Sequence, residues 1–201
     1  MDAGIGLGEQ PRFRDGDRIG ESDLQRLVAA AQARGLRRAT PYFLPYLSGE
    51  RTPHDDAHAR GVFFGLDSQT VPADLALAAL EGVAFAFADG MDVLLENSGA
   101  VGEISVTGGG ARFGFWGQLL ASALNRPLTY RVGSEIGAAL GAARLGRLAV
   151  TGEPPQAVCV MPPISHVTQP DAELSALLAG RRRIFVQLYR DLKDTFVEFA
   201  T

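Results

Sequence analysis

The alternation of apolar and polar positions predicts helices and strands in turn along most of the chain. A long helix is predicted over 74–97, which Pro72 is suited to start and Gly99 to end, and apolar side chains face almost every side of its middle, residues 77–87. Such a helix is expected between layers rather than on the surface. Further amphipathic helices are predicted over 23–35, 113–124, 135–148 and 171–196, and Gly180 is a point at which the last could bend.

Extended segments separate these helices. Strands are predicted over 42–47, 61–66, 103–107 and 127–132, and the second of them, with two phenylalanines, is expected to be buried. Residues 151–170 contain five prolines and are interpreted as a connector, and residues 1–21 as a loose, polar lead-in. The alternating order of strands and helices predicts a layered α/β fold.

Length and composition fit one globular domain, or one lobe of a larger protein. The chain has 201 residues, of which 46% are apolar and 21% are charged. It contains no apolar run of about 18 residues and no basic, apolar N-terminal signal, so we expect no membrane partner. Its single cysteine, Cys159, cannot form an intrachain disulfide, which agrees with a cytoplasmic protein.

Charge narrows the classes of partner. The net charge is −4, so we expect no nucleic-acid partner, and the run Arg181–Arg183 is interpreted as a solvated helix face. The acidic residues of the long helix, which are Glu81, Asp89 and Asp92, are interpreted as mostly solvated or capping groups. The only lysine, Lys193, does not follow a glycine, which excludes a P-loop.

The strongest local signal is the triple glycine Gly108–Gly110, which lies between a predicted strand and a predicted helix. Glycines let a backbone approach a ligand without a Cβ clash, and a helix N-terminus offers free N–H groups to an anion or a polar ring edge. The same pattern also suits a tight strand-to-helix turn without a ligand. The spacing of the glycines alone does not decide between a ligand-binding loop and a turn without a ligand.

Two other patterns allow alternatives. His54 and His58 stand four residues apart in a polar loop, which suits either a metal site or, as we prefer, a solvated loop. His166 has no visible partner in the sequence. Gly137 and Gly141 give one helix a small-residue face that suits either close backbone packing or contact with a nucleotide base.

Several motifs, taken in order, resemble the FGGY family of carbohydrate kinases. The segment 43–54, FLPYLSGERTPH, is similar to the xylulose-phosphorylating branch of that family, and residues 59–84 resemble its second signature. Residues 106–112, VTGGGAR, followed by Trp116, resemble its adenosine loop, and residues 135–143, EIGAALGAA, its closing helix. The resemblance covers roughly residues 23–197.

The resemblance implies one lobe of a two-lobed kinase with an actin-like, ribonuclease-H-like fold, in which a mixed sheet is flanked by helices. It places this lobe, the adenosine-binding C-terminal domain, at residues 22–201. It implies an ATP site at Gly108, Gly109, Gly110, Ala111 and Phe113. Mg²⁺ would accompany ATP without identifiable ligands here, and the catalytic aspartate, the phosphate loop and the sugar-binding residues would belong to an N-terminal lobe.

The implied reaction is phosphoryl transfer from Mg-ATP to D-xylulose, with the N-terminal lobe as the necessary partner. We therefore expect the chain alone to be inactive, with Asp55 and Asp56 as the nearest substitutes for a catalytic base. We also expect self-association through the apolar surface of an isolated lobe. The alternatives are a lobe of a glycerol, ribulose or gluconate kinase, and a non-catalytic nucleotide-binding module.

Overall fold

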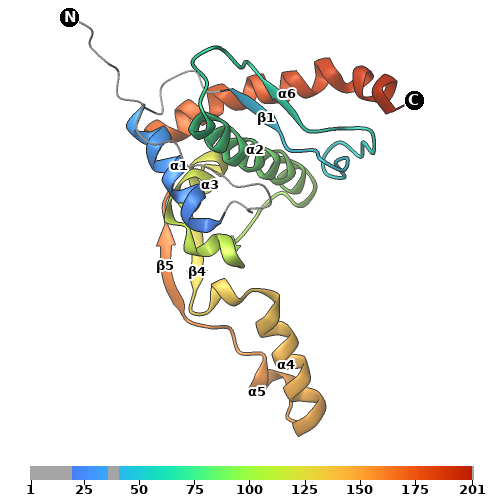
Figure 1. Cartoon of the computed structure of the whole chain (residues 1–201). Coiled ribbons are helices and arrows are strands. Elements are labelled where there is room, and N and C mark those ends of the chain that lie inside the picture. Colours follow the sequence, from blue (N-terminus) through green and yellow to red (C-terminus); the bar gives the residue numbers. More distant parts are fainter. Residues whose placement is uncertain (1–19, 36–40, 201) are drawn as a thin grey trace, which may run out of the picture.

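The structure, a computed structural model, describes residues 20–35 and 41–200. The predicted lead-in over residues 1–21 therefore lies outside the described residues, except for its last two positions. Helices α2 (Pro72–Ser98), α3 (Gly114–Leu124) and α6 (Ala172–Ala200) pack around one main apolar core (Figure 1). Its most buried large side chains include Tyr46, Phe85 and Phe185.

Two small sheets accompany these helices. Strand β1 (Tyr42–Leu44) pairs antiparallel with β2 (Val62–Phe64). In the second sheet, β4 (Leu128–Arg131) lies between β3 (Ser105–Val106), which is parallel to it, and β5 (Ile164–Thr168), which is antiparallel. The predicted α/β class with a mixed sheet is thus confirmed.

The long central helix follows its sequence signals closely. Pro72 opens α2, the side chain of Asp74 accepts a hydrogen bond from the Val71 N–H at 3.0 Å, and Gly99 closes the helix in the left-handed conformation with a φ of 71°. Its first two-thirds are largely buried, as predicted, although Phe87 is exposed. No helix in the described part of the chain is long and apolar enough to cross a bilayer.

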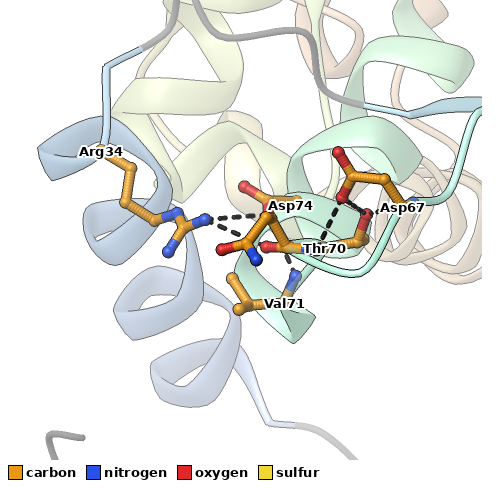
Figure 2. A network of polar contacts seen from close by, with 6 residues as sticks. Arg34, Asp67, Thr70, Val71 and Asp74 are labelled. Atoms are coloured by element: carbon orange, nitrogen blue, oxygen red, sulfur yellow. Dashed lines mark hydrogen bonds and ion pairs between the residues drawn. The ribbon is translucent and has the colours of Figure 1, made fainter. Parts of the chain in front are cut away.

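Helix α1 (Glu21–Ala33) docks against the start of α2. Its apolar side, which includes Leu27 and Ala31, packs on Ala73 and Leu77. Figure 2 shows the polar contacts beside this packing: Arg34 pairs with Asp74 at 3.6 Å, and the Thr70 hydroxyl donates to Asp67 at 2.9 Å in the preceding turn.

Two of the predictions for strands and connectors were wrong. The predicted connector 151–170 contains the short helix α5 (Pro155–Val158) and strand β5. The pair Pro162–Pro163 directly precedes β5 and Pro170 follows it, which suits the edge position that the strand occupies. The predicted buried strand at 61–66 is exposed at Phe63, Phe64 and Leu66, because β2 is an edge strand of a two-stranded sheet, although Val62 packs against the main core.

The charged residues of the two long helices were also misassigned. Arg181 donates to the buried Glu81 at 2.8 Å, and Arg182 forms ion pairs with Asp89 and Asp92. These pairs join α6 to α2, so two members of the arginine run are structural rather than solvated. Helix α6 is continuous through Gly180.

Helix α4 (Ala138–Thr151) and α5 form an arm that projects away from the body beyond the ends of β4 and β5 (Figure 1). Helix α4 has no buried residue, and a Cβ on Gly141 would meet no described atom within 4 Å. The predicted close packing of the small-residue face therefore does not occur at Gly141 within the described chain.

Candidate functional site

The predicted loop follows β3 and consists of a single glycine turn and a short helical segment. Gly108 has a φ of 96°, a conformation that L side chains rarely adopt, and it turns the chain out of the strand. Gly109, Gly110 and Ala111 then lie in the 3-10 helix η1 (Gly109–Arg112), and Phe113 caps α3. The first N–H groups of α3 have no acceptor within the helix, so this end favours an anion or a polar acceptor.

A second glycine turn, at Gly137, packs against the first turn at Gly108. The Gly108 N–H donates to the Ser134 carbonyl at 2.7 Å, and Ser134 begins the 3-10 helix η2 (Ser134–Ile136). A Cβ on Gly137 would lie 3.3 Å from the Gly108 Cα, so glycine permits this close approach. Helix α4 starts immediately after Gly137, whereas the sequence predicted its start at Glu135.

The outer side of the loop is open. A Cβ on Gly109 would meet no described atom closer than 3.9 Å, and both Gly109 and Gly110 are exposed. A Cβ on Gly110 would lie 3.3 Å from Trp116, the tryptophan that belongs to the sequence motif. The loop can therefore receive a flat group against Gly109 without displacing a side chain.

Hollows lie on both sides of the strand that leads into this loop. One, of about 190 Å³, is lined by Thr107, Ser134, Gly137, Leu140 and Arg144, among others. The other, of about 300 Å³, is mostly apolar and extends from Thr107 and Gly110 to Trp116 and α2. Both hollows border the glycine turns, and the surface of both is largely apolar.

Sequence reasoning missed the polar groups of the first hollow. Ser105 begins β3 and Thr107 directly follows it, a position that could have identified both, and Ser134 begins η2. Arg131 also lines this hollow, but Glu103 holds it with contacts of 2.7 and 2.9 Å, and this hydrogen bonding lowers the pKa of Glu103. Arg131 is thus a fixed part of the wall.

The two aspartates considered as substitute bases lie elsewhere. Asp55 is exposed and has a φ of 46°. Asp56 is buried and accepts hydrogen bonds from the N–H groups of His58 and Ala59 and from the Tyr189 hydroxyl. Burial opposes ionisation of Asp56, but these donors outweigh it and lower its pKa. Asp56 therefore pins its loop to α6, which is a structural role.

The histidine loop is not simply solvated. The His54 ring stacks on Tyr189 with 3.6 Å between the ring centroids, and its Nε2 lies 3.2 Å from the Tyr46 hydroxyl. Burial lowers the pKa of His54. His58 is exposed, and His166 stacks on Tyr130 with 4.4 Å between centroids. Within residues 20–35 and 41–200, no three His, Cys, Asp or Glu side chains are placed to hold a metal ion.

Comparison with known proteins places this geometry in a family. Residues 9–150 match the C-terminal domain of the FGGY family of carbohydrate kinases. The xylulose kinase of Escherichia coli (strain K12) is 44% identical over 175 residues, which are 86% of this chain and 36% of that protein. The xylulose kinase of Klebsiella pneumoniae is likewise 44% identical over 175 residues, which are 87% of this chain and 36% of that protein.

Solved structures agree with this assignment. A ligand-bound xylulose kinase from Lactobacillus acidophilus superposes with a TM-score of 0.70 and 26% identity, over 89% of this chain and 36% of that one. The chain thus spans about a third of the length of the relatives it matches.

Proposed function

Because the chain belongs to the FGGY family of carbohydrate kinases, we propose that it is the adenosine-binding lobe of a kinase that phosphorylates D-xylulose. In this proposal the γ-phosphoryl group of ATP passes to a xylulose hydroxyl oxygen, the hydroxyl proton passes to a carboxylate base, and ADP leaves. The choice of xylulose rests on the relatives, which are xylulose kinases at 44% identity.

The observation that carries the nucleotide assignment is the open glycine loop. The proposed adenosine contacts are Gly108, Gly109, Gly110, Ala111 and Phe113. Gly109 leaves room for a flat ring or ribose, and the N-terminus of α3 lies next to it. Gly137 and Leu140, at the start of α4, line the hollow beside the end of β3. The start of α4 is therefore the proposed second wall of the adenosine site.

The rest of the reaction is assigned to a second lobe. Asp56 is fully engaged in structural hydrogen bonds, so we propose that the base comes from an N-terminal lobe, which would also hold the sugar. Mg²⁺ would arrive with the phosphates and neutralise their charge. The division into residues 1–21 and 22–201, the cytoplasmic location and self-association through exposed apolar side chains remain predictions.

Gly109→Val tests the nucleotide site. We expect the unmodified chain to bind ATP with a Kd on the order of 1 mM, because only one side of the site is present, and the valine variant to bind at least about tenfold more weakly. Titration calorimetry measures both. Gly102→Val is the matched control, because a Cβ there meets no described atom within 4 Å and a Cβ on Gly109 would meet only the Arg112 side chain, at 3.9 Å; it should leave binding unchanged. Equal ATP affinity in both variants would place the site elsewhere.

A further inference from the structure

A third hollow, of about 570 Å³, lies between the end of α3 and the middle of α6, close to Asp92 of α2. Three arginines of α6 line it: Arg182, Arg183 and Arg190. Arg183 and Arg190 stand seven residues apart, which puts them on one face of the helix, with Val186 between them. None of these arginines lines either hollow beside Gly108.

The charges of this hollow are only partly balanced. Arg182 is committed to Asp89 and Asp92 through ion pairs. Arg183 and Arg190 are exposed, and their side chains form no hydrogen bond or ion pair with the described part of the chain. Arg126 lines an adjoining hollow together with Asp92 and Arg182. Four guanidinium groups therefore gather around two carboxylates, in a chain whose net charge is −4.

We propose that this hollow binds a small phosphate-bearing anion. A guanidinium group presents a planar fork of donors that matches phosphate oxygens, and two such groups without protein partners face one space here. The Asn125 amide adds a neutral polar group to the wall, and Leu124, Ala179 and Val186 supply apolar surface. The volume accommodates a phosphate ester as well as free phosphate, within the range typical of small-molecule sites.

The affinity should be modest. Asp92 and the C-terminal end of α3, which carries partial negative charge, both oppose an anion. Their effect is offset by Arg126, Arg183 and Arg190 together. We therefore expect a Kd on the order of 1 mM for inorganic phosphate.

The test is titration calorimetry of the full chain with inorganic phosphate and with glucose 6-phosphate, at constant ionic strength, with acetate as the monovalent comparison. The double variant Arg183→Gln/Arg190→Gln should weaken phosphate binding at least about tenfold. Arg51→Gln/Lys193→Gln is the matched control, because it removes the same charge from two exposed side chains that do not line the hollow.

The outcomes separate clearly. Saturable binding of either phosphate compound that is lost in the α6 double variant and kept in the control supports the proposal. The proposal is overturned if neither compound binds, if acetate binds equally well, or if the two double variants lose affinity equally. Because the α6 arginines lie away from the glycine loop, this result is independent of whether Gly109→Val weakens ATP binding.

Discussion

Gly82→Ala is expected to destabilise the fold by about 3 kcal/mol or more, which is a large fraction of a typical domain's stability. A Cβ at this position in α2 would lie 2.1 Å from the Phe43 carbonyl oxygen and 3.1 Å from the carbonyl carbon. Both atoms belong to the backbone of β1, so no side-chain rotation relieves the clash. The helix and the strand must separate, and this opens the core between them.

Gly90→Ala is the matched control for that substitution. Gly90 lies in the same helix, but a Cβ there meets no described atom within 4 Å. Alanine should therefore stabilise the helix, by up to about 1 kcal/mol. Chemical denaturation of the two variants measures the difference, and a similar loss of stability in both would contradict the packing of α2 on β1.

Arg181→Met should cost about 3–5 kcal/mol at neutral pH, because it leaves the carboxylate of Glu81 buried without its charged partner. Only 4% of Glu81 is exposed, and the distance from the Arg181 Nε to the Glu81 Oε2 is 2.8 Å. The guanidinium carbon also lies 4.5 Å from the centre of the Tyr42 ring. The double variant Glu81→Gln/Arg181→Met removes the unpaired charge, so it should recover most of the stability lost in the single variant.

The pH dependence of this variant has a defined sign. Burial raises the pKa of Glu81 even with Arg181 present, and removing the arginine raises it further. A carboxyl group whose pKa is raised in the folded state stabilises that state at low pH. This stabilisation is lost as the pH rises through the folded-state pKa. Denaturation at pH 5 and pH 7 should thus show a smaller loss at pH 5. A loss that is independent of pH would show that Glu81 does not carry the effect.

The sequence predicted the features that local chemistry decides. Pro72 and Gly99 mark the ends of α2 because proline suits a first turn and glycine adopts the left-handed cap. The glycine turn at Gly108 was predictable for the same reason, since it follows a strand and precedes a helix. These signals need no knowledge of the tertiary fold.

Features that depend on tertiary partners were not predictable in this way. An arginine run on a helix has the same sequence whether it faces water or, as at Arg181 and Arg182, carboxylates about 100 residues away. Strand β5 was hidden by its flanking prolines and by the lack of an apolar pattern, because an edge strand needs little burial. The contact of Gly137 with Gly108 joins two turns that only the folded sheet brings together.

The central claim is that this lobe supplies the adenosine side of a xylulose kinase and needs a second lobe for the chemistry. Loss of the groups that position the reactants forfeits about 7–11 kcal/mol of barrier lowering. The most direct measurement is coupled ADP release with Mg-ATP and D-xylulose, on the purified chain alone and with the N-terminal lobe of the Escherichia coli xylulose kinase added. We predict no xylulose-dependent ADP release by the chain alone and measurable release when the lobe is added; xylulose-dependent turnover by the chain alone would contradict the account.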